Sequence, residues 1–441
     1  MTTLSGWGRY PRAACRVLAP DTRAEAAEVL AAEPSLIPRG QGRSYGDAAL
    51  NPAATLRTGR MDRIRAFDPG TGRVTAEAGM TLADLLQVFV PRGWFPPVTP
   101  GTRFVSIGGM VAADVHGKNH HRDGSFGDHV ESLELLTADG RVLVCSETEN
   151  AALFRATRGG MGLTGVILSA TFRLRRIETA WIRQETLRCR DLAEAMALFE
   201  ESAGWTYTVA WIDCLAGRAA RGRSILYRGE HAGAGELPAG LAADPLRPRR
   251  KRVLRVPFDL PSFTLNGLSV RAFNALYYGA ARPGTGFVDY ETFFYPLDAV
   301  LEWNRIYGTP GFVQYQCVLP KAESAKGLDR LLGAIAASGQ GSFLAVLKLF
   351  GAGSGGPLSF PMEGYTLALD FRASPGTFSL LRALDRIVAE HGGRLYLAKD
   401  ACMGAGMLRR GYPGLDGFRA LRARHDPDRR FRSLLSDRLD L

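Results

Sequence analysis

Three glycine-rich stretches within the first 170 residues constrain the fold more than any other feature of this sequence. They read PRGQGRSYGDAALN (38–51), TPGTRFVSIGGMVAADVHGKNHHRDGSFG (99–127) and RGGMGLTGVI (158–167). Glycine frees the backbone to turn successive N–H groups toward one point, which forms a nest for an anion. A single stretch of this kind is explained equally well by a tight structural turn. Three of them in one region indicate a large, flat, phosphate-bearing ligand that lies along the backbone.

The familiar phosphate-binding and catalytic motifs do not occur in these stretches in the context that each of them requires. No GxGxxG follows a strand with an acidic residue roughly 20 positions later, and no GxxxxGK[ST] occurs. The histidines of HGKNHH (116–121) lack a carboxylate or cysteine partner at a recognised spacing, so we expect no metal centre. One GxSxG does occur, as GRSYG (42–46), but it is part of the first glycine-rich stretch, and a Ser-His-Asp hydrolase is not favoured.

The first 175 residues mix short helices and strands irregularly. A helix is predicted over 21–32 with Asp21 or Thr22 as its N-cap, and another begins after Thr81. A short strand is expected at 35–40, a hairpin turning on Asp139-Gly140, and a long alternating strand at 163–177. The lack of a repeated strand–helix–strand unit counts against a doubly wound nucleotide-binding fold.

The middle of the chain alternates strands with helices in a different way. Strand-like segments are expected at 206–215, 223–229, 287–297, 312–320, 343–351, 364–373 and 394–400, and helices at 191–203, 326–339 and 377–393. This order predicts an antiparallel sheet with helices on one face, so the fold class is α+β. A chain of 441 residues is long enough for two domains. We expect an N-terminal domain over 1–175, a second domain over 176–393, and a segment over 394–441 that returns to the first.

The formal charge of +11 suggests an anionic partner. The densest basic run is RPRRKRVLR (247–255), which is either a solvated loop or a strip that faces anionic lipid. Nucleic acid is not favoured, because no aromatic-interleaved basic surface accompanies the run. The six scattered cysteines and the absence of a signal-like or membrane-spanning apolar run predict a cytoplasmic protein.

Longer motifs carry a specific resemblance. GRSYGD, IGGMVAADVHGKNHH, GSFGDHV, GGMGLTG, EWNRIYG, QYQ, LKLFG, PLSFP and GGRLYLAKD occur in this order over nearly the whole chain. The sequence thereby resembles the decaprenylphosphoryl-β-D-ribose 2-oxidase family, within the vanillyl-alcohol-oxidase superfamily of FAD-linked oxidoreductases. The resemblance implies an FAD domain built from the N-terminal part and the last segment, and a substrate domain made of an antiparallel sheet with helices.

The same resemblance implies a set of FAD-binding residues. They are Pro38, Arg39, Gly40, Gln41, Gly42, Arg43, Ser44, Tyr45, Gly46, Gly101, Ser106, Ile107, Gly108, Gly109, Ala113, Asp114, Val115, His116, Ile167 and Tyr396. Relatives that tether the flavin covalently carry a histidine in or near the first glycine loop. Tyr45 stands in that loop here, so we expect FAD to be bound non-covalently.

The implied reaction oxidises the 2-hydroxyl of a polyprenyl-phosphate-linked ribose to a 2-keto sugar, with hydride passing to flavin N5. Lys399 is expected to position the hydroxyl or to act as its base, although it could instead pair with Asp400 or a phosphate. His116 is the alternative base or an orienting group. Lys118 is expected to stabilise negative charge on the reduced flavin or the substrate.

Other residues match substrate-pocket positions of the family. They are Gln314, Gln316, Lys348, Phe294, Arg305 and Thr366. Lys348 follows an apolar strand, where an anionic partner such as a lipid phosphate would offset its charge. Arg305 is explained equally well by a helix-surface salt bridge. Phe294 stands where the family carries tyrosine, with Tyr295 one step along, and Ala368 replaces a cysteine that nitro-aromatic inhibitors attack in mycobacterial members.

The resemblance also implies partners. A separate NAD(P)H-dependent short-chain reductase would complete an epimerisation to the arabinose form, and oxygen or a quinone would reoxidise the flavin. Peripheral contact with the inner face of the plasma membrane is expected through residues 240–260 and the apolar loop at 257–268. The alternatives are an aldonolactone or sugar-alcohol oxidase of the same fold, and a flavin-free basic module that binds membrane or nucleic acid.

Overall fold

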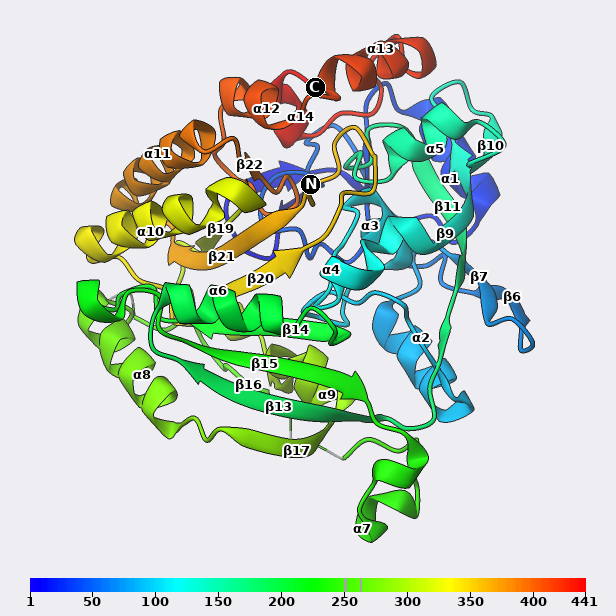
Figure 1. The fold of residues 1–441 in the computed structure, drawn as a ribbon. Coiled ribbons are helices and arrows are strands. Elements are labelled where there is room, and N and C mark those ends of the chain that lie inside the picture. Colours follow the sequence, from blue (N-terminus) through cyan, green and yellow to red (C-terminus); the bar gives the residue numbers. More distant parts are fainter. Residues whose placement is uncertain (250, 252, 262–263) are drawn as a thin grey trace.

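The N-terminal part of the chain is built around a five-stranded sheet (Figure 1). The computed structural model describes residues 1–441 except 250, 252, 262 and 263, so two arginines of the basic run lie outside the described residues. The strand order is β10 (Val142–Ser146), β9 (Val130–Leu136), β11 (Val166–Arg173), β7 (Arg73–Glu77) and β6 (Ile64–Asp68), and all four pairings are antiparallel.

Two predictions for this sheet have different outcomes. The β9–β10 hairpin turns at Asp139-Gly140, where Gly140 has a φ of 83°, so the predicted turn is confirmed. Strand β11 forms as predicted, but its burial does not alternate, because every residue from Val166 to Phe172 is buried. Its two faces pack against different hydrophobic clusters, since Ile167 belongs to one and Leu168 to the other.

The helices and smaller sheets of this part cover the five-stranded sheet. The helix predicted after Asp21 is α1 (Arg23–Ala32), whose N-cap is Thr22, and the helix predicted after Thr81 is α2 (Leu82–Phe89). Both caps accept a backbone N–H three residues on, from Glu25 and Asp84. The other helices are α3 (Ile107–Ala112), α4 (His120–Asp123) and α5 (Ala151–Thr157). A small parallel sheet has the order β3 (Val17–Leu18), β5 (Thr55–Arg57) and β4 (Ile37–Arg39). Two strand pairs complete this part, β1 (Thr2–Ser5) with β2 (Arg12–Cys15) and β8 (Trp94–Phe95) with β12 (Arg175–Arg176).

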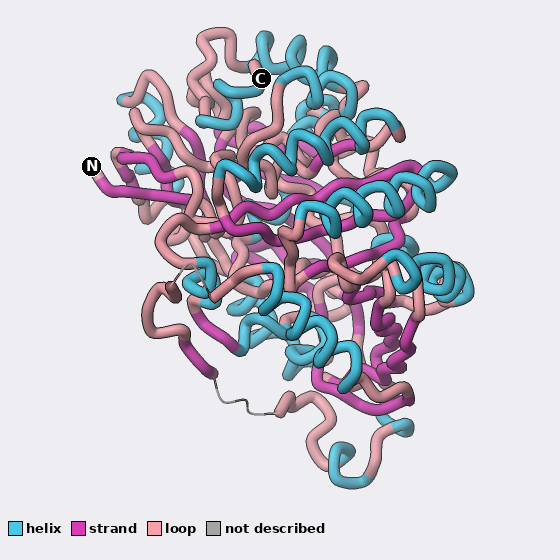
Figure 2. Tube along the Cα trace, turned by 90° about the vertical axis from the view of Figure 1, so that its left-hand side faces the viewer, coloured by secondary structure: helices cyan, strands magenta, loops and turns pink. Residues whose placement is uncertain are grey.

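An eight-stranded sheet forms the second body, and every pairing in it is antiparallel. Its order is β17 (Gly284–Asp289), β13 (Trp181–Cys189), β15 (Ser224–His231), β14 (Tyr207–Ile212), β20 (Ala345–Phe350), β21 (Gly364–Arg372), β19 (Phe312–Pro320) and β22 (Arg394–Leu395). Helices α6 (Leu192–Glu201), α10 (Lys321–Ser338) and α11 (Pro375–Glu390) lie over one face of it (Figures 1 and 2). The antiparallel sheet with helices on one face is therefore confirmed.

Side chains alternate between the two faces of this sheet. In β21, Leu367 and Leu369 are buried in the core under the helices, whereas Thr366 and Ala368 face the other way and line a cavity. The expected strand at 287–297 is only partly a strand. Residues Tyr290–Phe294 form helix α9, because Asp289 caps them by accepting the N–H of Thr292 and the following aromatic side chains pack on one side.

The last segment joins the two bodies. Strand β22, at the start of this segment, pairs with β19 and belongs to the eight-stranded sheet. Helices α12 (Ala405–Gly411), α13 (Leu415–His425) and α14 (Leu434–Leu439) follow. Phe431 then forms a parallel bridge with Leu36. The division into domains at 175 and 393 stays a prediction.

The segment between β15 and β19 carries the remaining elements. They are α7 (Ala239–Ala242), which projects at the bottom of Figure 1, β16 (Leu254–Arg255) paired with β18 (Val300–Leu301), and α8 (Gly267–Ala280) along the outer edge. Among the described residues, none of the helices has the length and hydropathy that a membrane span requires.

Candidate active site

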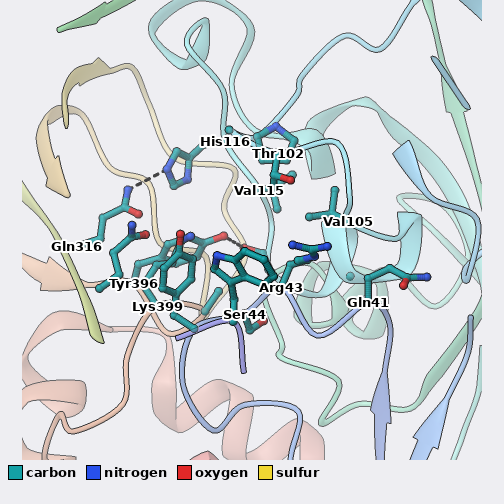
Figure 3. A pocket seen from close by; sticks show the side chains of 18 of the residues that line it. Gln41, Arg43, Ser44, Thr102, Val105, Val115, His116, Gln316, Tyr396 and Lys399 are labelled. Carbon is teal, nitrogen blue, oxygen red and sulfur yellow. Dashed lines mark hydrogen bonds between the residues drawn. The ribbon is translucent and has the colours of Figure 1, made fainter. Parts of the chain in front are cut away.

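A cavity of about 410 Å³ lies between the glycine-rich stretches and the face of the eight-stranded sheet that its helices leave open. This volume is within the range of roughly 300–1,000 Å³ that small-molecule sites occupy. All three glycine stretches contribute to the lining, and so do β14, β19, β20 and β21. Figure 3 labels side chains of the first two stretches together with Gln316, Tyr396 and Lys399. Segments far apart in the sequence therefore meet at one site.

The first glycine loop forms an open backbone cradle. The N–H groups of residues 41–44 donate to no other group of the described chain, whereas Tyr45 N donates to Ala398 O at 2.9 Å. Gly42 has a φ of 65°, and a Cβ on Gly40 would stand 2.0 Å from Ser106 Oγ. Unused N–H groups beside such close approaches suit a diphosphate, so the residues present fit an FAD.

Most of the residues expected to bind FAD line this cavity. They are Pro38, Arg39, Gly40, Gln41, Gly42, Arg43, Ser44, Tyr45, Gly101, Ser106, Gly108, Gly109, Ala113, Val115, His116, Ile167 and Tyr396. Arg39 also holds the loop itself, because its guanidinium donates to Ala49 O at 3.1 Å and to Ser5 O at 2.7 Å.

Three expected FAD ligands lie behind the lining. Gly46 packs so closely on the C-terminal segment that a Cβ there would be 1.8 Å from Asp400 O. Ile107 is fully buried in the core of the N-terminal body. The carboxylate of Asp114 accepts from Ser354 Oγ at 2.6 Å and Ser359 Oγ at 2.5 Å, so it holds the loop at 354–359 and is not part of the cavity lining.

Alternate residues of β19 and β21 deliver polar groups to the cavity. Gln316 Nε2 lies 2.9 Å from His116 Nε2 and 3.2 Å from Thr366 Oγ1, and Figure 3 shows the amide pointing at the imidazole. Burial, with Lys348 and other nearby cations, lowers the pKa of His116 well below its ordinary value. The ring is therefore neutral, and the amide N–H occupies its Nε2 lone pair. This geometry favours His116 as an orienting group over a base.

Three lysines face the cavity, and none of them forms an ion pair with a described residue, although the Asp370 carboxylate opposes the lowering of the pKa of Lys399. Lys118 donates to Phe293 O and lies 4.2 Å from that ring's centroid, and Lys399 lies 3.7 Å from the ring centroid of Tyr45. Burial lowers the pKa of Lys118 to about 7 and that of Lys348 to about 8. The lysine ion pairs among the described residues are made elsewhere, by Lys251 and Lys321. Buried cations of this kind favour an anionic ligand.

The similarity of this chain to known proteins agrees with the interpretation of the cavity as an FAD site. A family model described as an FAD binding domain matches residues 15–146. The decaprenylphosphoryl-beta-D-ribose oxidase of Mycolicibacterium smegmatis is 39% identical over 448 residues, which cover 99% of this chain and 97% of the relative. The chain belongs to the decaprenylphosphoryl-β-D-ribose oxidase family. It is accordingly an FAD-dependent oxidoreductase.

Two further relatives show how far the similarity extends. An uncharacterized protein of Streptomyces coelicolor is 40% identical over 82% of this chain and its own full length. L-Gulonolactone oxidase of Bos taurus is 35% identical over 132 residues, only 30% of each chain. Similarity to the lactone oxidases is thus partial, whereas similarity to the decaprenylphosphoryl-β-D-ribose oxidase family runs through the eight-stranded sheet.

Asp370 is a site residue of this family member that the sequence pattern did not single out. It is fully buried on β21, its Oδ1 accepts from Gln314 Nε2 at 2.6 Å, and its Oδ2 has no hydrogen-bond partner among the described residues. Burial raises the pKa of this carboxyl, while Lys399 opposes the rise. The available signal was its spacing, because Asp370 shares the face of Thr366 and Ala368 in an otherwise apolar strand.

Two predicted contacts are replaced by others. Arg305 lies outside the cavity, where it pairs with Glu302 at 2.9 Å and donates to Pro257 O at 2.7 Å, so the surface-salt-bridge interpretation is the correct one. Asp400 does not pair with Lys399, because its Oδ2 accepts from Arg438 at 2.9 Å.

The structure also places the aromatic pair Phe294 and Tyr295 and the histidines of HGKNHH. Phe294 lines the cavity, whereas the hydroxyl of Tyr295 is buried against Thr99. The histidines of HGKNHH have different surroundings. His121 bonds Trp205 O at 2.9 Å, whereas neither ring nitrogen of His120 has a hydrogen-bond partner in the part of the chain that the structure describes. Among the described residues, no group of three or more His, Cys, Asp or Glu side chains is placed to hold a metal.

Proposed function

We propose that this oxidoreductase oxidises the 2-hydroxyl of a ribose joined to polyprenyl phosphate, giving the 2-keto sugar in the first half of an epimerisation to the arabinose form. The observation that carries the proposal is that two buried lysines of the cavity, Lys118 and Lys348, form no ion pair with a carboxylate among the described residues. A neutral lactone leaves these charges unpaired, whereas a phosphate-linked sugar supplies a counter-charge. The similarity to the mycobacterial oxidase supports the same substrate.

The roles of the side chains follow from their placement. FAD, when bound in the cradle, supplies the hydride acceptor. Lys399 holds the reacting hydroxyl and takes its proton, because burial lowers the pKa of this amine and makes its neutral form accessible. Gln316 and the neutral His116 orient the sugar, and Lys348 faces the phosphate. Lys118, beside the Phe293 ring, stabilises negative charge.

We further propose the surroundings of the reaction. FAD is held non-covalently, because Tyr45 occupies the loop position where a tether would stand. A separate NAD(P)H-dependent short-chain reductase consumes the keto sugar, and oxygen or a quinone takes up the electrons. The protein acts at the cytoplasmic face of the membrane, with peripheral contact through the basic segment at 240–260.

The decisive experiment mixes the oxidised holoenzyme anaerobically with polyprenylphosphoryl-ribose and, separately, with a free aldonolactone. Loss of the visible flavin absorbance with the lipid-linked sugar alone is the expected result. Loss with the lactone alone would overturn the proposal in favour of a lactone oxidase. A protein purified without any flavin absorbance would be a binding module instead.

A further inference from the structure

Helix α8 presents an apolar face to solvent. Leu268 and Leu276 are 79% and 74% exposed, and Phe273 and Tyr277 are exposed beside them. No acidic residue occurs in the helix, and its one charged side chain, Arg271, donates to Leu215 O at 2.6 Å. Surface helices of soluble proteins normally turn polar residues outward, so an outward apolar face indicates a partner.

The opposite side of α8 is firmly attached to the protein. Asn274 is fully buried and its Nδ2 donates to Asp213 Oδ1 at 2.7 Å, while Val270 packs into the main core. Asn266 caps the helix by accepting the N–H groups of Leu268 and Ser269. The exposed leucines are therefore held outward by a fixed helix.

An aromatic path connects this face to the cavity. Trp211 and Tyr277 both line the cavity, and their ring centroids are 4.8 Å apart. Phe273 stacks on Tyr277 at 5.8 Å and continues the path onto the exposed face. The Tyr277 hydroxyl lies 3.1 Å from that of Tyr227, which also lines the cavity. The mouth of the site thus opens beside α8.

We propose that α8 lies in the surface of a phospholipid bilayer, with Leu268 and Leu276 inserted among the acyl chains. A helix of 14 residues is about 21 Å long, too short to cross a bilayer but suited to lie in its plane. Residues 264–288 carry Arg271 and Arg282 and no acidic residue, which suits anionic headgroups. Figure 1 shows α8 on the outer edge of the molecule, away from the C-terminal helices.

This placement has a consequence that rests on the proposed function. If the substrate is lipid-linked, the cavity mouth at Tyr277 meets the bilayer directly. The apolar chain then remains in the membrane while the sugar and phosphate enter the cavity along the Trp211–Tyr277–Phe273 path. Transfer of the chain through water, which is costly for every methylene exposed, is avoided.

The test is co-sedimentation of the holoenzyme with phosphatidylcholine vesicles, with and without phosphatidylglycerol. The double variant Leu268→Gln and Leu276→Gln should bind at least about tenfold more weakly, because two exposed leucines no longer insert. The matched control is Val142→Gln with Val144→Gln, which removes two valines of β10 that are 49% and 43% exposed in the other body. That control should bind like the wild type, and all three proteins should keep their flavin spectrum and unfolding midpoint.

Three outcomes would overturn the proposal. They are a wild-type protein that binds neither vesicle, an equal loss in the control, and a concentration-dependent dimer that the α8 variant abolishes, which would make this face an interface between copies. Turnover separates this inference from the proposed function. The α8 variant should oxidise a soluble short-chain prenylphosphoryl ribose normally and a long-chain one in vesicles poorly. If the wild type binds through α8 but oxidises neither sugar, the substrate assignment fails and the membrane contact stands.

Discussion

At the scale of single residues, Lys399 shows how its surroundings define a chemical role. Its amine lies over the Tyr45 ring, and its expected partner Asp400 is engaged by Arg438. Burial lowers the pKa of Lys399, the Asp370 carboxylate opposes this, and Lys348 adds to it. A lysine held in this way can be neutral near physiological pH, which a solvated lysine cannot.

The rate of flavin reduction should therefore depend on pH in a defined direction. The neutral amine is the proton acceptor and is populated above its lowered pKa, so the rate should rise with pH and reach a plateau below the ordinary lysine range. Lys399→Met should lower the rate of flavin reduction by roughly 10²–10⁴-fold and abolish its rise with pH, while FAD stays bound. Anaerobic stopped-flow absorbance across pH measures both effects.

The matched control for this profile is Lys321→Met, because Lys321 pairs with Glu200 on the surface at 2.9 Å. It should reproduce the wild-type profile. If the rate of the Lys399→Met variant rises with pH as that of the wild type does, another group accepts the proton.

Ala368 predicts a difference in inhibitor chemistry. It lines the cavity and pairs in register with Gln316 and Val346. The sequence resemblance aligns it with a cysteine of the mycobacterial members. Because alanine offers no thiolate, nitro-aromatic inhibitors that trap a thiol should leave the protein unlabelled, and Ala368→Cys should become labelled. Intact-protein mass spectrometry after turnover measures this. Stoichiometric labelling of the wild type would contradict the prediction.

At the scale of elements, the glycine loops act through close approach as well as through backbone freedom. Gly46 and Gly101 differ in how closely other atoms approach them. A Cβ on Gly46 would meet the backbone of Asp400, which cannot move aside, whereas a Cβ on Gly101 meets nothing within 4 Å. The first glycine joins two segments and the second borders the cavity.

Gly46→Ala should consequently lower the free energy of unfolding by about 1–3 kcal/mol, through overpacking against the loop that follows Lys399. Gly101→Ala should change it by less than about 0.5 kcal/mol. Denaturant unfolding in saturating FAD measures the difference without a contribution from lost cofactor. Equal stabilities of the two variants would refute the role assigned to Gly46.

At the scale of the whole molecule, Arg438 joins three distant segments. Its guanidinium donates from α14 to Asp47 Oδ1 and Asp400 Oδ2, both at 2.9 Å, which links the first glycine loop to the loop that carries Lys399. The two carboxylates raise the pKa of Arg438, yet burial still raises that of Asp47. The arginine thus offsets only part of the cost of burying Asp47, and removing it leaves that cost uncompensated.

Arg438→Met should lower the free energy of unfolding by about 3–5 kcal/mol, because it strands two buried carboxylates. It should also weaken FAD binding, since both loops border the cavity. Arg432→Met is the control, because its ion pair with Asp437 is half exposed and should matter by less than about 1 kcal/mol. Thermal unfolding and equilibrium dialysis of FAD measure the two effects. An Arg438→Met variant as stable as the wild type would show that the contacts of Arg438 with Asp47 and Asp400 are dispensable.

Predictions from the sequence succeeded where the cause is local. The helix caps at Thr22 and Thr81 and the turn at Asp139-Gly140 depend on residues a few positions apart, and all three form as expected. The strand expected over 287–297 forms only as far as Asp289, also for a local reason, because the capping side chain of Asp289 outweighs the aromatic β-propensity of the residues after it. The resemblance supplied the family, which the comparisons then established.

The sequence by itself determined the α+β class, the glycine cradle and the FAD-linked family, because close backbone approach requires glycine and long ordered motifs are specific. Only the tertiary structure decided that Asp370 lies behind Gln314, that Arg305 stays outside the cavity, and that α8 turns its leucines outward. Alternation assigns residues of a strand to two faces but does not say which face the helices cover. That choice depends on contacts between segments hundreds of residues apart, and no local pattern encodes it.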